Sequence, residues 1–194
     1  MGDFSQNGIV ANLHDFSIRS TEQIEKDLLK FSKERKLELI LPCLYSELEG
    51  DALPNIVNEI SKTKYLNHVI IGLDQANKAQ AKKAWKFFKK LKTPFSILWN
   101  DGPKLKKLDK ELKGIDLAPK QMGKGRNVWY CIGMAIARDE ARSVALHDCD
   151  IKTYDRRLLA KLFYPVENPL FNYEFCKGYY PRIADNKMHG RVAR

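Results

Sequence analysis

The stretch Val144-Ala145-Leu146-His147-Asp148-Cys149-Asp150 decides the fold of this chain. In it a short apolar run ends in two carboxylates separated by a single small residue. A continuous apolar run predicts a strand that is buried on both faces, as in a parallel sheet. The carboxylates would then lie at the carboxyl end of that strand, where open α/β sheets bind ligands. The stretch therefore predicts a parallel α/β sheet with a ligand site at this edge.

The two carboxylates have a spacing that suits a metal site. On an extended backbone Asp148 and Asp150 point to opposite faces. A turn starting at Cys149 would let both approach one divalent cation and the diphosphate that it carries. This is typical of the Asp-X-Asp metal site of nucleotide-sugar transferases. Aspartate pairs at strand ends also form turns and cap helices, so a purely structural role stays open.

Size and charge indicate one globular domain with a basic surface. The chain has 194 residues, 44% of them hydrophobic, and a formal net charge of +10. Lysines gather in 78–92 and 104–113, and in the first run Trp85, Phe88 and Leu91 recur at helical spacing. That pattern favours a solvated helix face over a nucleic-acid-binding surface. A basic protein with small anionic substrates has the same composition.

The cysteines and the hydropathy pattern bear on the compartment. The four cysteines, Cys43, Cys131, Cys149 and Cys176, show no CxxC or Cys/His ligand spacing, which predicts reduced thiols. No run of 18 apolar residues and no signal-peptide pattern occurs, so we expect no membrane partner and a cytoplasmic location.

Hydrophobic periodicity predicts strands and helices in alternation. The expected strands are 37–41, 68–73, 95–99 and 144–146. The expected helices start after a capping box at Ser20 to Gln23 and after a cap at Asp51, and cover 77–91, 105–112, 126–141 and 156–163. In the helix 126–141, the apolar side is expected to hold Val128, Ile132, Ala135 and Ile136.

This order requires right-handed crossovers and a mostly parallel, doubly wound sheet. We expect an arm and helix over 1–36, a core over 37–150, and the start of another part over 151–194. In that last part Tyr164-Pro165 is expected to break the helix, and 171–180 to form an aromatic strand or hairpin.

Two loops at strand or helix ends are candidate ligand contacts. Leu41 to Glu47 follows the first strand, where backbone groups can pair with a base and an acid can bind a ribose hydroxyl. Gly123-Lys124-Gly125-Arg126 opens a helix, where free N–H groups and a lysine favour an anion. It lacks the spacing of a Walker A loop. An ordinary strand exit and an ordinary turn are the alternatives.

Two further segments carry candidate anion contacts. They are Cys176-Lys177-Gly178-Tyr179-Tyr180 and His189-Gly190-Arg191. Lys177 and Arg191 could pair with a carboxylate or phosphate, the arginine in bidentate fashion. Ordinary surface charge is the alternative for both.

Taken together, these segments resemble the glucosyl-3-phosphoglycerate synthase family over nearly the whole chain. The resemblance rests on Pro42-Cys43-Leu44, Gly123-Lys124-Gly125 with Trp129, Asp148-Cys149-Asp150, Lys177-Gly178-Tyr179-Tyr180 and Gly190-Arg191-Val192, in this order. It implies a GT-A fold similar to family-2 glycosyltransferases. The implied reaction moves glucose from a nucleotide diphosphate sugar to 3-phosphoglycerate with retention of configuration.

The resemblance also implies roles for individual residues. Lys124, Asp148 and Asp150 would be the catalytic set, with Asp148 and Asp150 binding Mg²⁺ or Mn²⁺. The donor would contact Pro42, Cys43, Leu44, Glu47, Asp74, Gln75, Lys124, Asp148 and Cys149. The acceptor positions would be Lys177, Gly190, Arg191 and Ala193.

The chain departs from the family pattern at three places. The acid expected after Pro42-Cys43-Leu44 is offset to Glu47, Ala193 stands where a hydroxyl residue is usual, and Asp74-Gln75 replaces an Asp-Ser contact to uridine. The base of the donor nucleotide (UDP or GDP), the hexose that it carries, and the choice between free and phosphorylated glycerate as acceptor therefore stay open. A homodimer also stays open. A sugar-phosphate nucleotidylyltransferase would carry its glycine-rich loop after the first strand, and a nucleic-acid-binding module would use 78–113.

The family continues beyond the position that corresponds to Arg194 and takes a metal-binding histidine and further acceptor contacts from that later segment. None of the four histidines here fits that role by order. We therefore expect the donor-binding part of a longer enzyme, or a truncated product, with an incomplete metal shell, which binds nucleotide weakly and turns over little or nothing by itself.

Overall fold

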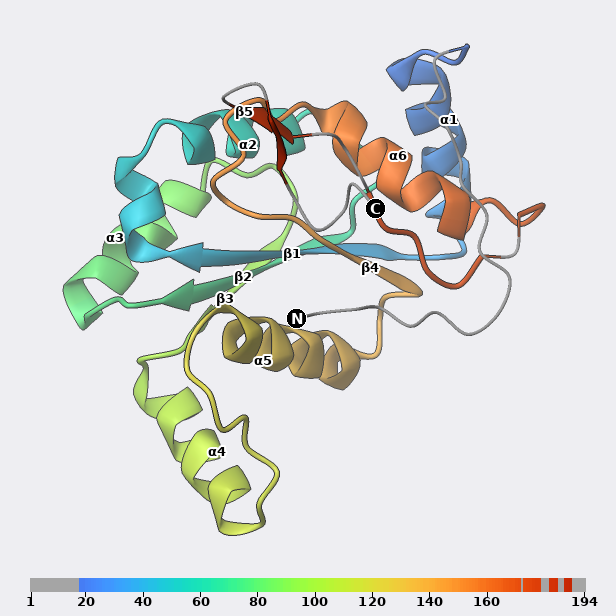
Figure 1. Ribbon diagram of the computed structural model, residues 1–194. Helices are drawn as coiled ribbons and strands as arrows, with labels where there is room; N and C mark the ends of the chain where they lie inside the picture. The colour runs from blue at the N-terminus through green and yellow to red at the C-terminus, as the bar shows by residue number, and fades with distance from the viewer. Residues whose placement is uncertain (1–17, 172, 179–181, 185–186, 190–194) are drawn as a thin grey trace.

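The computed structural model describes residues 18–171, 173–178, 182–184 and 187–189. Within them the chain forms a four-stranded parallel sheet in the order β3-β2-β1-β4, with helices on both faces (Figure 1). A separate antiparallel pair joins β5 and β6. The α/β class and the parallel sheet predicted from the sequence are confirmed.

The alternation of strands and helices is also confirmed, with boundaries that differ by a few residues. The strands are β1 (Leu37–Leu44), β2 (His68–Asp74), β3 (Phe95–Trp99), β4 (Ser143–Leu146), β5 (Arg182–Ala184) and β6 (Lys187–His189). The helices are α1 (Thr21–Phe31), α2 (Ala52–Ile60), α3 (Lys78–Phe88), α4 (Pro103–Gly114), α5 (Lys124–Arg138) and α6 (Arg156–Glu167), and a 3-10 helix η1 (Tyr45–Glu49) follows β1.

The strand order reverses between β1 and β4. The chain runs outward from β1 through β2 to β3, and then returns through α5 to place β4 on the other side of β1. Helices α1, α2, α3 and α6 cover one face, and α5 covers the other (Figure 1). Leu39 and Leu41 enter the larger core on the first face, whereas Ile40 packs with Cys131 under α5.

Strand β4 is shorter and more exposed than its apolar sequence predicted. Ala145 faces the larger core and is buried, but Val144 and Leu146 are each 43% exposed. These two side chains lie on the face that α5 covers, and α5 packs on β1 and β2 rather than on β4. In the described part of the chain, the prediction that this strand is buried on both faces is wrong.

Strand β1 continues past the proline at which the sequence suggested an end. Pro42, Cys43 and Leu44 pair with β2, whereas pairing with β4 stops at Ile40. The last bond on that side runs from the His147 N–H to the Ile40 carbonyl, at 3.1 Å. The next bond of a parallel ladder would need an N–H at position 42, which proline lacks. Pro42 therefore ends the β1–β4 ladder just before Asp148.

The buried side of α5 differs from the predicted apolar side. Ala135 is buried, but Ile132 and Ile136 are 46% and 72% exposed. The buried residues of the helix are Arg126, Asn127, Tyr130, Cys131 and Ala135. Close contact of α5 with β2 at Gly72 accounts for this rotation, because a side chain there would collide with the Asn127 amide.

Of the two helix caps predicted from the sequence, one is present in the structure. The capping box of α1 is present: Ser20 Oγ accepts from the Gln23 N–H at 3.2 Å, and Gln23 Oε1 accepts from the Ser20 N–H at 2.9 Å. Asp51 stands at the cap position of α2, but its side chain accepts no capping hydrogen bond. The backbone of Asp51 is already helical, which turns its carboxylate away from the free N–H groups.

Two predictions for the last part of the chain are wrong. Helix α6 runs through Pro165 to Glu167, because burial of Phe163, Tyr164 and Pro165 outweighs the lost hydrogen bond and the clash that a proline causes in a helix. Among the described residues of 171–180, none lies in a strand. Instead the Phe171 ring packs edge-on against Tyr164, with ring centroids 5.9 Å apart. Packing on α6 thus overrides the strand propensity of this aromatic segment.

Lysines cover the solvent side of α3. Phe88 is buried in the core, whereas Trp85 is exposed and the ammonium group of Lys89 lies 3.9 Å from the centre of its ring. Trp85 therefore belongs to the solvated face rather than to the core. None of the helices in the described residues combines the length and apolar content that a membrane crossing needs.

Candidate functional site

The candidate site lies at the carboxyl edge of the sheet, where the strand order reverses between β1 and β4. Ligands of open α/β sheets bind at such reversal points, because the crossovers on the two sides leave in opposite directions and open a crevice. Here β1 leads into η1, and β4 leads into the segment that carries Asp148 and Asp150. The structure therefore brings two predicted segments, Leu41 to Glu47 and Asp148-Cys149-Asp150, to neighbouring strand ends.

Lys124, in the first turn of α5, extends its side chain to this edge of the sheet. Its ammonium group forms an ion pair with Asp148 Oδ1, and both side chains are about half exposed. The free N–H groups at the start of α5 add positive partial charge beside the ion pair. An exposed cation at a helix N-terminus, next to a carboxylate, can bind an anion together with a cation that the anion carries.

Asp150 follows in the turn that was predicted to start at Cys149. Residues 149 and 150 form a turn, and the Asp150 side chain is exposed. The described residues contain no group of three or more metal-binding side chains. Mg²⁺ is commonly held by one or two carboxylates together with substrate phosphates and water. The donor set of Asp148 and Asp150 fits such a shared site, with the remaining ligands coming from the substrate.

Buried side chains pack behind the segment that carries Asp148 and Asp150. His147 Nδ1 lies 2.9 Å from the Tyr154 hydroxyl, and burial lowers the pKa of His147 to about 4. Contact with the Cys43 thiol, together with burial, raises the pKa of Cys149 well above its usual value. These side chains are therefore neutral, and they fix the position of the segment that carries the two acids.

Burial also restricts what the predicted donor contacts can be. Pro42, Cys43 and Cys149 are buried, so their side chains face the core and only their backbone groups reach the edge. Leu44 is exposed at the end of β1, and Glu47 is half-buried in η1. A base or ribose at this edge would meet backbone atoms, the Leu44 side chain and the Glu47 carboxylate.

Asp74 and Gln75 lie beside Leu44 at the end of β2. Leu44 and Asp74 are register partners, and Asp74 Oδ1 accepts from the Gln75 N–H at 3.0 Å. Gln75 has a φ of 55°, a left-handed conformation that is uncommon outside glycine. Asp74 is buried and Gln75 is exposed, so Gln75 offers the freer side chain to a ligand.

Residues predicted for the acceptor are only partly described. Lys177 is exposed in the irregular segment after α6. Gly190, Arg191 and Ala193 lie outside the described residues. The acceptor assignment stays a prediction.

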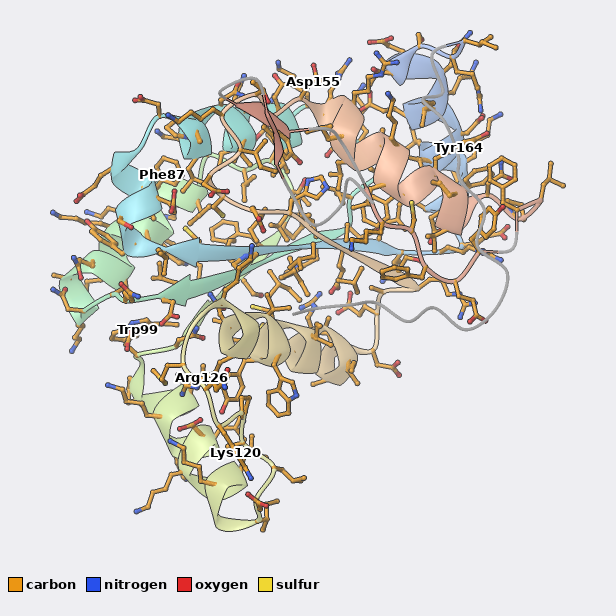
Figure 2. All side chains as sticks on the ribbon, in the orientation of Figure 1. Phe87, Trp99, Lys120, Arg126, Asp155 and Tyr164 are labelled. Atoms are coloured by element: carbon orange, nitrogen blue, oxygen red, sulfur yellow. The ribbon has the colours of Figure 1, made fainter. Side chains whose placement is uncertain are left out.

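The sequence interpretation missed residues that position α5. Asn127 Nδ2 donates to the Gly72 carbonyl at 2.7 Å, which ties the start of the helix to β2. Arg126 is buried beside it and extends toward α4 (Figure 2). Two polar residues directly after a Gly-Lys-Gly turn, at the expected start of a helix, were the signal that could have identified them.

The chain is similar in sequence to two synthases of known name. The chain is 42% identical over 194 residues to the glucosyl-3-phosphoglycerate synthase of Persephonella marina, which covers 100% of this chain and 48% of the relative. It is similar to such synthases along its whole length. The enzyme of the same name from Methanococcoides burtonii is 39% identical over 196 residues, covering 99% of this chain and 47% of the relative. The resemblance predicted from the motifs is confirmed, and the chain spans about half the length of these relatives.

Solved structures that match the chain have lower sequence identity. Glucosyl-3-phosphoglycerate synthase from Mycobacterium tuberculosis, in complex with Mn²⁺, UDP and glucosyl-3-phosphoglycerate, is 13% identical with a TM-score of 0.49, over 82% of this chain and 47% of that one. Mannosyl-3-phosphoglycerate synthase from Rubrobacter xylanophilus is 15% identical with a TM-score of 0.48, over 77% and 47%. No family model matches the chain.

Proposed function

We propose that this chain forms the donor-binding part of a GT-A glucosyltransferase. The reaction would move glucose from UDP-glucose or GDP-glucose to 3-phosphoglycerate, with retention at the anomeric carbon. The observation that carries the proposal is the ion pair of Lys124 with Asp148 at the reversal point of the sheet. Whole-chain identity of 42% to a synthase of this name supports it.

In this proposal the nucleotide lies across the ends of β1 and β2. Backbone groups at Cys43 and the exposed Leu44 would contact the nucleoside, and the Glu47 carboxylate would accept a hydrogen bond from a ribose hydroxyl. Gln75, with its exposed amide, is the candidate for reading the base. The buried position of Asp74 suits it to hold the Gln75 backbone rather than to touch the ligand.

Asp148 and Asp150 would hold Mg²⁺ or Mn²⁺ against the donor diphosphate. A bound ion of this kind supplies Lewis-acid stabilisation of the leaving nucleotide. Lys124 and the N–H groups of the first turn of α5 would neutralise charge that develops on the same phosphates. Because an ammonium group already reaches Asp148, that carboxylate is held in place before the donor arrives.

The acceptor belongs to the part of the chain that follows Asp150. Lys177, Gly190 and Arg191 are proposed to bind the phosphate and carboxylate of 3-phosphoglycerate, with Ala193 nearby. Residues 37–150 would form the nucleotide-sugar core and 151–194 would begin the acceptor side. We place the protein in the cytoplasm, in keeping with its four free cysteines.

A binding titration tests the donor site directly. UDP-glucose and GDP-glucose are titrated by calorimetry into the chain with Mn²⁺, with Mg²⁺ and with EDTA. One of the two should bind, and the metal should tighten binding. A labelled oligonucleotide serves as the control, because a nucleic-acid-binding module would bind it with steep salt dependence and no need for metal. Oligonucleotide binding without nucleotide-sugar binding would reject the proposal.

A transfer assay tests the reaction. Glucosyl-3-phosphoglycerate formation is followed by mass spectrometry with 3-phosphoglycerate or glycerate as acceptor, and NMR of the anomeric proton reports the configuration. An inverted product would contradict the proposed retention.

A further inference from the structure

The first turn of α5 has little local support. Its cap residue, Gly123, has a φ of 115° and provides no side-chain hydrogen bond, and no acidic residue lies in the first turn. Lys124 is followed by Gly125, and glycine is among the residues least favourable to a helix. The turn that carries Lys124 therefore depends on tertiary contacts for its order.

Those contacts come from Asn127 and Arg126. Asn127 binds the Gly72 carbonyl on β2. Arg126 reaches in the other direction, and its Nη2 lies 3.1 Å from Asp109 Oδ1 on α4. The side chains of Arg126 and Asp109 are both more than nine-tenths buried.

The Asp109 carboxylate interacts with three donor side chains. Besides Arg126, the Tyr130 hydroxyl donates to Oδ1 at 2.5 Å, and Lys113 Nζ lies 2.8 Å from Oδ2. Hydrogen bonds from Lys113, Tyr130 and Arg126 hold the pKa of Asp109 well below its usual range, so the carboxylate stays charged. One carboxylate on α4 thus binds two consecutive turns of α5. Helix α4 extends away from the sheet (Figure 1), and this cluster ties it back.

We propose that Asp109 and Arg126 are positioning residues that hold the first turn of α5, so that Lys124 stays beside Asp148 and ready for the donor diphosphate. The link to the diphosphate rests on the proposed function. The hold on the turn itself does not. Neither residue needs to touch the ligand, because Arg126 acts through its position two residues after Lys124.

The same helix offers a matched control. At the other end of α5, Arg138 Nε lies 3.1 Å from Glu38 Oε1, and Glu38 is as buried as Asp109. This pair also joins α5 to another element, but it lies at the amino end of the strands, away from Lys124. Glu38→Gln therefore removes another buried carboxylate that binds α5, without touching the first turn.

The first measurement needs no ligand. Amide hydrogen exchange is compared for the unsubstituted chain, Asp109→Asn and Glu38→Gln, with thermal unfolding recorded for each. Asp109→Asn should speed exchange at residues 127–130, whose N–H groups bond the carbonyls of residues 123–126, by at least about tenfold more than Glu38→Gln does. Equal exchange there in the two variants would overturn the proposal. If Asp109→Asn does not fold, Tyr130→Phe removes one donor only, and it should act in the same direction.

The second measurement is a double-mutant cycle in nucleotide-sugar binding, with Mn²⁺ present. Lys124→Ala and Asp109→Asn should each weaken binding by about tenfold, and the double variant should be little weaker than Lys124→Ala, because both changes remove the same contact. Glu38→Gln should leave binding unchanged. Fully additive losses for Lys124 and Asp109 would overturn the positioning role.

The two hypotheses fail separately. If the unsubstituted chain binds neither UDP-glucose nor GDP-glucose, the proposed function is wrong, and the exchange experiment still decides whether Asp109 orders the turn.

Discussion

At Gly72, the absence of a side chain sets how closely α5 packs on the sheet. A Cβ atom built there would lie 1.9 Å from Asn127 Oδ1 and 2.5 Å from Cys131 Sγ. Neither neighbour can withdraw easily, because Asn127 is bonded to the Gly72 carbonyl and both residues are buried. Gly72 therefore lets Asn127, one turn after Lys124, lie close to the sheet.

Gly72→Ala should destabilise the fold by about 1–3 kcal/mol, the usual cost of overpacking a core. Gly133→Ala is the control, because nothing lies within 4 Å of a Cβ at that exposed helical position. It should stabilise the chain by about 0.5–1 kcal/mol, since alanine favours helix. Urea unfolding measures both, and equal effects would contradict the structure at Gly72.

Asp150 provides a test of the metal assignment at the same scale. Asp150→Asn removes one anionic ligand, and we expect the tightening of donor binding by Mn²⁺ to fall by at least about tenfold, with binding in EDTA unchanged. Calorimetry with and without metal measures this. A variant that keeps the full effect of Mn²⁺ would show that the cation binds elsewhere.

The residue types at this site were predictable from the sequence, but their exposure was not. The turn at Cys149 follows from a short strand that ends in Asp-X-Asp. The burial of Pro42 and Cys43 depends on how far β1 continues beside β2, and that depends on partners thirty residues away in sequence. Local patterns do not contain such information.

At the level of helices and strands, the two predicted cap residues differ in whether their side chains accept a capping hydrogen bond. Ser20 accepts the hydrogen bond that its sequence predicts, whereas Asp51 does not. The alternation of strands and helices was predictable because each element is amphipathic or continuously apolar. The rotation of α5 was not, because its buried side contains Arg126 and Asn127, which pair with groups on α4 and β2.

Ser20→Ala should lower the free energy of unfolding by about 1 kcal/mol, because the first turn of α1 loses its capping bond. Asp51→Ala should cost less than about 0.5 kcal/mol, since no such bond exists there. Chemical denaturation distinguishes the two. A larger loss for Asp51 would mean that its carboxylate caps α2 in solution.

For the whole molecule, a histidine far from the candidate site should shape the dependence of stability on pH. His68 is buried at the start of β2, with Nε2 2.9 Å from Ser96 Oγ. Burial and the nearby Arg138 lower its pKa, although Glu38 and Glu140 oppose the shift. The unfolded chain therefore binds a proton at a pH where the folded chain does not.

The contribution of His68 should thus be favourable above its ordinary pKa of about 6.5 and be lost as pH falls below it, by at most about 1.4 kcal/mol per pH unit. Unfolding of the unsubstituted chain and of His68→Gln is measured between pH 7.5 and 5.5. The stability advantage of the unsubstituted chain should shrink on acidification. An advantage that grows instead would contradict the direction of the shift.

The place of β4 in the sheet also bears on the order in which the chain folds. Glu38 pairs with His68 on one side and with Val144 on the other, so the second contact closes a far longer loop. Contacts between residues that are distant in sequence tend to form late. Closing the loop between them costs chain entropy before the contact stabilises the fold. The β1–β2–β3 unit should therefore assemble first, and the strand that carries Asp148 and Asp150 should join last. Substitutions at Ala145 would accordingly speed unfolding more than they slow folding.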